Sequence, residues 1–528
     1  MCRDNNVGEA ARNCHAKMST LVESTSPLPS RRLALLPVDA RPVVRAQVVQ
    51  LARAGGIELM VPPVSTLGHF REPADRDVLA DWLRALASAV EGFVISLDML
   101  IYGGLVPSRF IADSKESLLA RLEVVRQLKQ AFPHKPIYAF LATMRISNNN
   151  VNEEEKSYWD QYGELIWRWS YYSDQFQVTG DAEANAQAIA ASSSIPEAIR
   201  EDYLATRARN FAVARSVLDL VDYEGINGLV LPQDDTARYG FNIAERRELE
   251  ALVAAKKLQD WVRVYPGADE VAHTLVAHLA NEVWVNPALK VYIAYSDPDH
   301  VHRLVARYED RPITDSLAAQ LAVVDAVVVD DIDSADLLLA VHTKGVAQGD
   351  WAMKIALPTH SAVNGDWLAE IHAAHQAGKS VAVLDLAYAN GGDPALMEQL
   401  PAYIPFSKLA AYAGWNTASN SIGSLLAQCA LARGAYQKPT NQEVVCLRIA
   451  EDYLYQAIWR QRIRDVIDES AVSAEKLHAV VAEMFIPAAN AWLAEHELDY
   501  RVESIQLPWQ RSFEIDIQLV PKSALQAS

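Results

Sequence analysis

The chain has 528 residues, of which half are hydrophobic and 22% are charged. Its 48 Lys and Arg against 67 Asp and Glu give a formal net charge of −19. That balance disfavours the phosphate backbone of nucleic acids as a partner. An acidic protein of this kind instead favours neutral sugars, cations or metal ions as ligands.

Residues 1–30 are polar and end in a stretch rich in Ser, Thr and Pro, which predicts a disordered tail. They lack the apolar region of a signal peptide, and no apolar run in the chain reaches the roughly 20 residues of a membrane-spanning helix. The four cysteines, Cys2, Cys14, Cys429 and Cys446, show no CxxC spacing, as expected of free thiols in a reducing compartment. The sequence therefore predicts a cytoplasmic protein with no membrane partner.

The first block, residues 31–287, alternates short apolar runs with helical patterns. Strands are predicted at 33–38, 57–61, 93–97, 136–142, 228–232 and 262–265. The apolar spacing at 43–54 predicts a helix that Gly55 and Gly56 terminate. Strands and helices in this alternation indicate βαβ units and a mainly parallel sheet.

Within this block the alternation stops at residues 150–225, which read as a long aromatic and charged helical pattern. We therefore expect a helical insertion. Two placements are open: over a ligand-binding cleft, or as a cap that only covers the sheet.

The second block, residues 288–435, repeats the strand and helix rhythm in KVYIAYSD, AVVVDD, SVAVLDLAY and LAAYAGWN. His342 and Lys344 are interpreted as part of a polar loop. Residues 436–528 combine amphipathic helices with the alternating strand pattern SFEIDIQLV. This third part predicts a small α+β segment that serves as scaffold or as a contact in a homo-oligomer.

The predicted fold class is thus α/β, with two Rossmann-like parallel-sheet blocks, a helical insertion and a small C-terminal α+β segment. A distorted (β/α) barrel is the second possibility. The irregular spacing and the presence of more than eight strand candidates argue against the barrel.

Polar clusters follow most of the predicted strands. In parallel α/β folds, ligand-binding and catalytic groups lie just past the carboxyl ends of the strands. The carboxylates chosen as catalytic candidates are Asp39, Asp98 and Asp235. The substrate-binding candidates are Arg41, Tyr102, Arg109, Asn149, Gln233, Asp234, Asp269, Glu270, Asp385, Asn390, Trp415 and Asn416.

Several of these residues also suit a structural role. Asp39 can cap the helix at 43–54, and Asp269 and Glu270 can stabilise the first turn of another helix. The run from Asn148 to Glu155 predicts either a polar substrate rim or a solvated charge run. Trp415 and Asn416 form a pair typical of sugar contacts, since Trp offers an apolar face and Asn both a donor and an acceptor.

The chain has no GxGxxG after a strand, no GxxxxGK[ST], no GxSxG and no HExxH, which disfavours dinucleotide, P-loop, serine-hydrolase and zincin chemistry. Carboxylates, amides and aromatics without a cofactor motif favour a hydrolase that resembles glycoside hydrolases, using one carboxylate as acid and another as nucleophile or base. One alternative is an enzyme that binds Mg²⁺ or Mn²⁺ through Asp39, Asp98 and Asp234 or Asp235. Another is a non-catalytic protein that closes its two blocks around a small molecule.

Five longer segments, LPVDARP, SLDMLIYGGLVPSR, LPQDDTARYGFN, YPGADEVA and YAGWNTASNSIG, together resemble the bacterial family catalogued as domain of unknown function 4127. The resemblance spans about residues 33 to 520. The family name implies no activity, and the expectation of an enzyme rests on the polar strand-end loops. The resemblance leads us to expect a second Asp where Ala40 stands, which leaves Asp39 as the carboxylate candidate in that loop.

Overall fold

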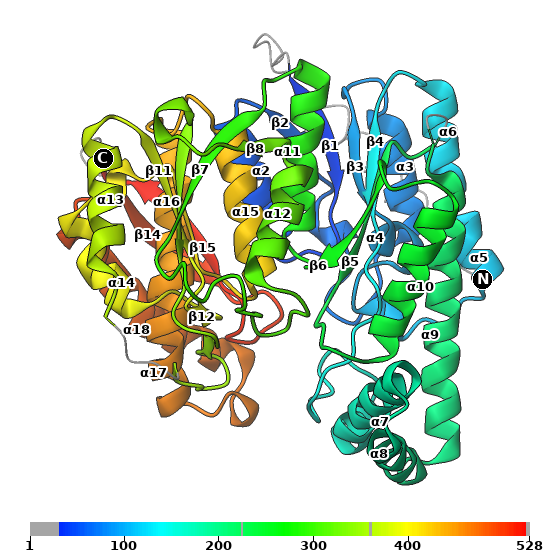
Figure 1. Ribbon diagram of the computed structural model, residues 1–528. Coiled ribbons are helices and arrows are strands. Elements are labelled where there is room, and N and C mark those ends of the chain that lie inside the picture. The colour runs from blue at the N-terminus through cyan, green and yellow to red at the C-terminus, as the bar shows by residue number, and fades with distance from the viewer. Residues whose placement is uncertain (1–30, 223–224, 358–361, 524–528) are drawn as a thin grey trace, which may run out of the picture.

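The computed structural model describes residues 31–222, 225–357 and 362–523, so the tail predicted at residues 1–30 lies outside the described residues. Two α/β lobes lie side by side, each built on its own parallel sheet (Figure 1). We call the sheet of β1 to β6 with its helices the first lobe, and the sheet of β7 to β13 with its helices the second lobe.

The first lobe contains a six-stranded sheet in the order β2-β1-β3-β4-β5-β6, with every pair parallel. Buried apolar runs form these strands, as predicted at all six positions. Their bounds are β1 (Arg32–Leu36), β2 (Glu58–Met60), β3 (Phe93–Ser96), β4 (Ile137–Phe140), β5 (Gly228–Gln233) and β6 (Val262–Pro266).

The second lobe contains a five-stranded parallel sheet in the order β13-β11-β9-β7-β8. Its strands are β7 (Leu289–Tyr295), β8 (Ala326–Val328), β9 (Leu337–His342), β11 (Ser380–Asp385) and β13 (Ala411–Ala413). A separate two-residue ladder pairs β10 (Gly349–Asp350) with β12 (Tyr388–Ala389). In each sheet the second strand in the chain lies on one side of the first, and all later strands lie on the other side. The direction in which strands are added therefore reverses between β1 and β3 and between β7 and β9. Sheets of this kind bind ligands at such positions.

The central strand of the second sheet, β9, was not predicted. Only eight residues separate it from the end of β8, and one short 3₁₀ turn, Ile332–Ser334, replaces the usual crossover helix. The interpretation of His342 as a loop residue was therefore wrong, because it is the buried last residue of β9. The predicted α/β class with two parallel sheets is confirmed, and the two open sheets replace the barrel alternative.

Helices cover both faces of each sheet (Figure 1). In the first lobe, apolar side chains of α2 and α11 pack on one face and those of α3, α6, α9 and α10 on the other. In the second lobe, α12 and α15 cover one face, and α13, α14, α16 and α18 cover the other. The bounds are α2 (Ala46–Ala54), α3 (Arg76–Leu86), α4 (Leu97–Tyr102), α5 (Lys115–Ala120), α6 (Glu123–Ala131), α10 (Phe241–Ala255), α11 (Val271–Trp284), α12 (Ile313–Val323), α13 (Gly365–Gln376), α14 (Pro394–Gln399) and α15 (Ala418–Leu431).

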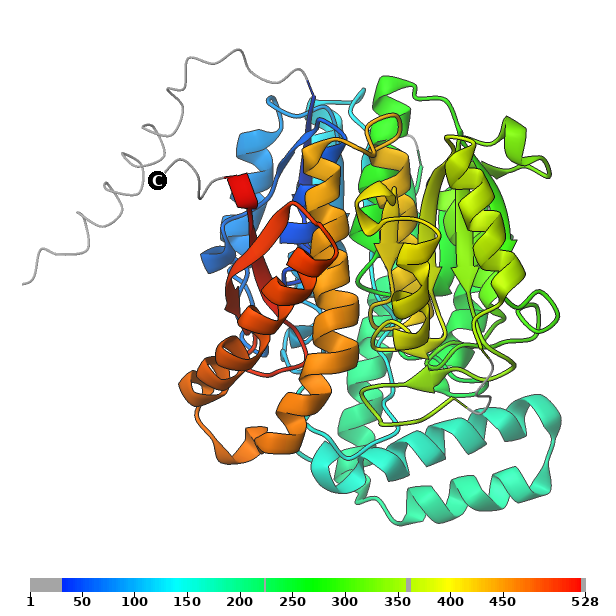
Figure 2. The same ribbon diagram turned by 90° about the vertical axis from the view of Figure 1, so that its left-hand side faces the viewer.

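The helical insertion comprises α7 (Trp159–Thr179), α8 (Ala182–Ser193) and α9 (Glu197–Val217). The C-terminal half of α9 packs against the first sheet through Val213 and Val217. The pair α7–α8 projects away from the sheets as an antiparallel arm (Figure 2). The insertion thus combines a sheet cover with a projecting arm.

The C-terminal segment contains α16 (Pro439–Arg448), a π-helix (Ile449–Trp459), α17 (Arg460–Val466), α18 (Ala474–Glu495) and the antiparallel hairpin of β14 (Tyr500–Gln506) and β15 (Asp516–Pro521). Helix α18 has the length and apolar composition of a membrane span. Its apolar stripe, repeated every four residues from Leu477 to Leu493, lies in the core that the hairpin also enters. Cys429 and Cys446 are buried free thiols.

Candidate active site

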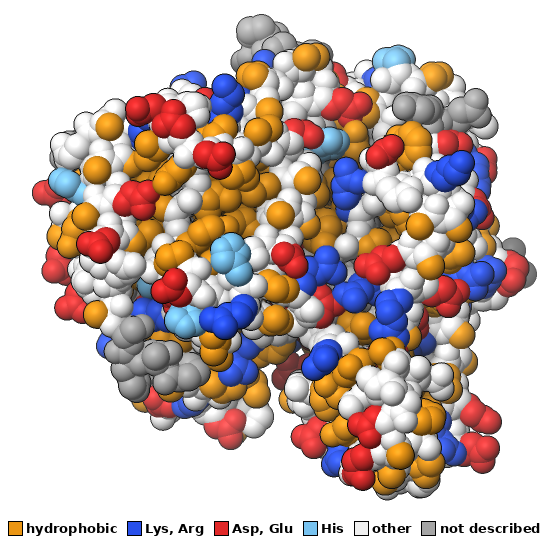
Figure 3. Space-filling model, viewed as in Figure 1, with side chains coloured by type: hydrophobic (Ala, Val, Ile, Leu, Met, Phe, Trp, Pro, Cys, Tyr) orange, Lys and Arg blue, Asp and Glu red, His pale blue; other side chains and the backbone are white. Residues whose placement is uncertain are grey.

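A cavity of about 250 Å³ lies where the carboxyl ends of both sheets meet. Side chains of both lobes line it, together with the tip of the C-terminal hairpin, which we define as residues 507–515. The surface is hollowed at this junction, and charged side chains of both signs gather near it (Figure 3). The polar lining residues are Arg41, Arg145, Ser147, Asn149, Glu154, Gln233, Asp234, Asp235, Asp269, Tyr308, Glu309, Asn390, Asn416, Thr417, Asn420 and Arg511.

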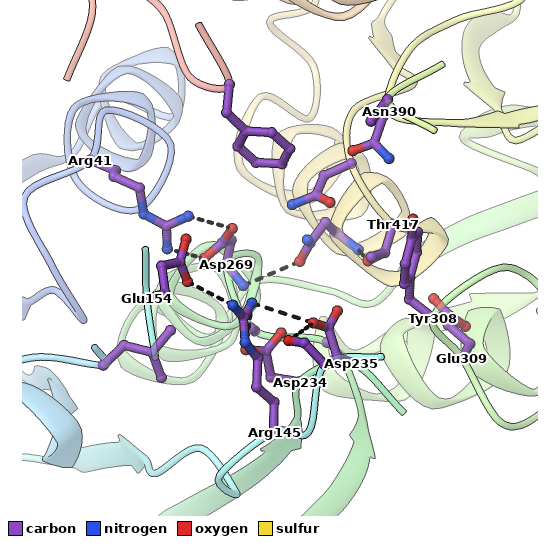
Figure 4. A pocket seen from close by; sticks show the side chains of 18 of the residues that line it. Arg41, Arg145, Glu154, Asp234, Asp235, Asp269, Tyr308, Glu309, Asn390 and Thr417 are labelled. Carbon is purple, nitrogen blue, oxygen red and sulfur yellow. Dashed lines mark hydrogen bonds and ion pairs between the residues drawn. The ribbon is translucent and has the colours of Figure 1, made fainter. Parts of the chain in front are cut away.

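Arg145, in the loop after β4, holds two acidic side chains of the cavity. Its two terminal nitrogens lie 3.0 Å from a Glu154 oxygen and 3.3 Å from an Asp235 oxygen. Asp234 is more distant, at 3.8 Å from Arg145. Glu154 and Asp235 therefore lie on either side of one guanidinium (Figure 4).

The environments of these two carboxyl groups shift their pKa values in opposite directions. Burial raises the pKa of Asp235 to about 6, and the neighbouring Asp234 adds to the effect. Burial also opposes ionisation of Glu154, but the charges of Arg145, Arg511 and Arg109 outweigh it and lower the pKa of that group. One carboxyl group of the cavity thus retains its proton near neutrality more readily, while the other is held ionised.

A second arginine, Arg41, pairs with carboxylates on two sides. It donates to both oxygens of Asp269, at 2.6 and 3.1 Å, and to both oxygens of Asp39. Burial raises the pKa of Asp269 to about 6; the charge of Arg41 opposes this rise, and the charge of Asp39 adds to it. Of the three side chains, Arg41 and Asp269 line the cavity, and Asp39 lies behind them.

Four non-glycine residues of the cavity wall have a backbone in the left-handed region. They are Asp235 (φ 46°), Tyr308 (φ 66°), Asn390 (φ 59°) and Asn416 (φ 58°). Asn tolerates this region, whereas a bulky residue such as Tyr pays a steric cost there. Strained residues of this kind concentrate at binding and catalytic sites.

Tyr308 and Asn390 are fixed by one buried acid of the second lobe. The Tyr308 hydroxyl donates to one oxygen of Asp350 at 2.7 Å, and the Asn390 amide donates to the other at 3.1 Å. Asp350 is fully buried. The second lobe therefore presents a preformed polar wall opposite Arg145 (Figure 4).

The structure brings together eight of the fifteen residues singled out in the sequence and places seven away from the cavity wall. The eight are Arg41, Asn149, Gln233, Asp234, Asp235, Asp269, Asn390 and Asn416. The seven are Asp39, Asp98, Tyr102, Arg109, Glu270, Asp385 and Trp415.

Asp98, a first choice for catalysis, lies in the first turn of α4 and is 1% exposed. It accepts a hydrogen bond from the backbone N–H of Ala142 at 3.0 Å. Burial raises its pKa to about 7. Tyr102, at the other end of α4, is buried in the apolar core of the first lobe. Both residues are buried, and neither lines the cavity.

Arg109 and Glu270 act from behind the wall. Arg109 donates to the side chain of Glu155 at 3.0 Å and lies 3.7 Å from Glu154. Glu270 accepts from the backbone N–H of Ala268 at 2.9 Å. Both side chains support residues or segments that face the cavity.

The second-lobe candidates Asp385 and Trp415 are sealed off. Asp385 accepts from the backbone N–H of Asp393 at 2.6 Å and from the Tyr412 hydroxyl at 3.3 Å. Asp393 in turn contacts the ring of His342 at 3.0 Å. Trp415 is 2% exposed and packs in the core between the lobes.

The triad considered for Mg²⁺ or Mn²⁺, Asp39, Asp98 and Asp234, does not converge. Asp39 is bound to Arg41, and Asp98 to the backbone of Ala142. Within residues 31–222, 225–357 and 362–523, no group of three or more His, Cys, Asp or Glu is arranged to hold a metal ion.

Sequence reasoning missed several residues of the wall. Arg145 follows a predicted strand, so the strand-end rule applied to it as well. Glu154 lay in the run that predicted either a rim or a charged surface. Tyr308 and Arg511 gave no local signal, because one lies thirteen residues beyond β7 and the other in a hairpin interpreted as scaffold.

A family model described as a protein of unknown function (DUF4127) matches residues 33–518. The chain belongs to this family. The match extends from β1 to β15 and includes the cavity and the hairpin tip, so the resemblance found in the sequence motifs is confirmed. A comparison with curated proteins finds no match.

Proposed function

We propose that this member of the DUF4127 family is a hydrolase that cleaves small, uncharged glycosides by carboxylate acid catalysis. Asp235 donates the proton to the leaving-group oxygen. Glu154 is the ionised partner on the other side of Arg145 and serves as base or nucleophile. Glycoside hydrolases need such a pair, one protonated and one ionised.

The observation that carries this proposal is the arrangement around Arg145. Because one guanidinium binds both acids, at 3.0 and 3.3 Å, the bound oxygens lie no more than about 9 Å apart, which does not exceed the largest separation of catalytic pairs in glycoside hydrolases, roughly 10 Å. The opposite pKa shifts support these roles, since the acid must be protonated and its partner ionised. Asp98 and Asp39, which lie away from the wall, receive no catalytic role in this mechanism.

The charges of the wall support an uncharged substrate. Each arginine of the lining already pairs with two or more acidic side chains, Arg41 with Asp39 and Asp269, for example. The lining contains five acids against three arginines. A phosphate or a sugar acid would have to displace a carboxylate from an arginine. Sugar hydroxyl groups can accept from the arginines and donate to the acids while the arginine–carboxylate ion pairs stay intact.

The test uses aryl glycosides that differ in leaving group. The acid assists departure of a poor leaving group, so Asp235→Asn is expected to slow hydrolysis of such substrates by about 10²–10⁴-fold. The same variant should cleave a nitrophenyl glycoside much more nearly at the wild-type rate. For the wild type, kcat/KM should fall as the pH rises through the pKa of about 6 of Asp235, because the acid loses its proton.

Glu154→Gln tests the partner. Its turnover of an activated glycoside should be restored by added azide, which replaces the missing nucleophile or base. Asp81→Asn, exposed on α3, is the matched control and should behave as wild type. Equal activity of Asp235→Asn and wild type on poor leaving groups would contradict the proposed role of Asp235.

A second candidate is a binding protein without turnover. It is supported by the position of the cavity between two lobes, since closure of such lobes around a ligand is a common binding motion. Calorimetry with the same glycosides separates the two, because tight binding without hydrolysis by the wild type favours the binding protein.

A further inference from the structure

The tip of the C-terminal hairpin, residues 507–515, reaches across the cavity from the end of the chain. Its anchor is the C-terminal helical segment: the Ser512 backbone N–H donates to Glu469 at 2.9 Å, and the Tyr455 hydroxyl donates to the Ser512 carbonyl at 2.8 Å. The Gln456 amide donates to the carbonyl of Phe513 at 2.8 Å. These bonds fix the backbone of the tip independently of the first lobe.

The side chains of the tip dock on the first lobe. Trp509 stacks on Phe70, with ring centroids 4.8 Å apart, and the guanidinium of Arg41 lies 4.8 Å from the Trp509 ring. Both aromatic contacts bury Trp509 to 7% exposure. The face of this ring is therefore occupied by protein, and its role is to fasten the tip.

Arg511 is the central side chain of the tip. Its guanidinium lies 5.3 Å from the Phe70 ring, 5.0 Å from the Trp509 ring and 5.3 Å from the Phe513 ring. It also forms a two-point ion pair with Glu514, at 2.7 and 2.9 Å. Three rings and one carboxylate thus fix the orientation of Arg511.

Arg511 also contacts two acidic side chains of the first lobe, and one of them lines the cavity. One terminal nitrogen lies 2.8 Å from a Glu154 oxygen, and the other lies 3.2 Å from Glu153. Arg145 binds the second oxygen of Glu154 at 3.0 Å. Glu154 is therefore held between an arginine of its own lobe and an arginine delivered by the hairpin.

We infer that Arg511 is a positioning residue, and that the hairpin tip completes the active site by holding Glu154 in place and ionised. This inference rests on the proposed function, in which Glu154 is the ionised partner of Asp235. The hairpin tip, residues 507–515, is then part of the catalytic apparatus, in place of the scaffold role expected from the sequence.

The test compares Arg511→Gln and Arg511→Lys with Arg501→Gln, an arginine on β14 of the same hairpin whose ion pair is with Glu503. Removing one of the arginines around Glu154 is expected to raise the pKa of that carboxyl by about 1 or more. In Arg511→Gln the acidic limb of the kcat/KM profile should move upward accordingly, with KM changed less than kcat. Arg511→Lys should restore part of the shift, and Arg501→Gln should show none.

A substrate-independent readout is carboxyl ¹³C NMR of glutamate-labelled protein, with Glu154→Gln assigning the signal. Because the pKa of Glu154 is strongly lowered, the readout is the pH at which its signal begins to move on acidification. An onset at higher pH in Arg511→Gln than in the wild type supports the inference. The same onset in the wild type and a folded Arg511→Gln variant overturns it. Failure of the wild type to cleave any glycoside, together with a shifted onset, overturns the proposed function and leaves the positioning of Glu154 established.

Discussion

Glu270→Gln is the substitution whose effect on stability follows most directly from the structure. Glu270 is 1% exposed behind the cavity wall, and burial raises its pKa from 4.5 to about 8. The folded protein therefore binds a proton on Glu270 that the unfolded chain releases above pH 4.5. The contribution of Glu270 to the free energy of unfolding is therefore fully present below pH 4.5 and is lost as the pH rises to about 8.

The magnitude follows from the pKa difference. Each pKa unit corresponds to about 1.4 kcal/mol, and Glu270 is already half ionised at pH 8, so between pH 6 and pH 8 the wild type should lose about 2 kcal/mol through Glu270. Gln keeps the hydrogen bond from the Ala268 N–H through its oxygen, whereas the bond that the Gln320 amide donates to Glu270 at 3.2 Å is lost. That lost bond costs the variant the same stability at pH 6 and at pH 8, because Gln does not titrate. Glu270→Gln should therefore show no pH-dependent loss of stability from this position.

The measurement is urea unfolding of wild type and variant at pH 6 and pH 8. The stability of Glu270→Gln relative to wild type should rise by about 2 kcal/mol between the two pH values. Glu201→Gln, exposed on α9, removes the same charge without burial and should show no such rise. A constant difference between Glu270→Gln and wild type at both pH values would refute a neutral, buried Glu270.

The other predictions concern two buried polar side chains, Asp98 and Arg41. Asp98→Asn should keep the fold and hydrolytic activity of the wild type, because Asp98 is away from the cavity wall; a loss of about 10²-fold or more in kcat would return Asp98 to the catalytic candidates. Arg41→Met should destabilise the protein by about 3–5 kcal/mol, because Asp39 and Asp269 then remain buried without their partner. Thermal unfolding checks the second, and a Tm equal to that of wild type would contradict it.

The strands of the first lobe were predictable because each is a short run of buried apolar residues between helical patterns. The same rule failed at β9, where the usual crossover helix is missing and an acidic turn precedes the strand. Periodicity reports local burial, so it locates strands. It contains no information on which strand lies in the middle of a sheet.

The expectation that ligand-binding groups follow the carboxyl ends of strands identified the correct edge of the first sheet. It did not predict which of the side chains at that edge reach the cavity and which are buried. Asp234 and Asp235 follow β5 in an irregular loop, and both reach the cavity. Asp98 follows β3 equally closely, but α4 begins at once and turns its carboxylate toward the backbone of Ala142. At these two strands, the start of a helix directly after β3 and its absence after β5 explain why Asp98 is turned away and Asp235 faces the cavity.

The two lobes share a strand order, yet their strand ends differ in access, and contacts distant in sequence explain the difference. In the second lobe the π-helix lies over the strand ends: the backbone N–H of Gly414 donates to the Asp452 carboxylate at 2.8 Å, and that of Gly392 to the Asp452 carbonyl at 3.0 Å. Asp385 is sealed beneath this cover. In the first lobe the corresponding edge is bounded by the hairpin tip, which leaves a cavity and contributes Arg511 to it. The acid pair of the proposed mechanism therefore belongs to the lobe whose strand ends the C-terminal segment borders without filling.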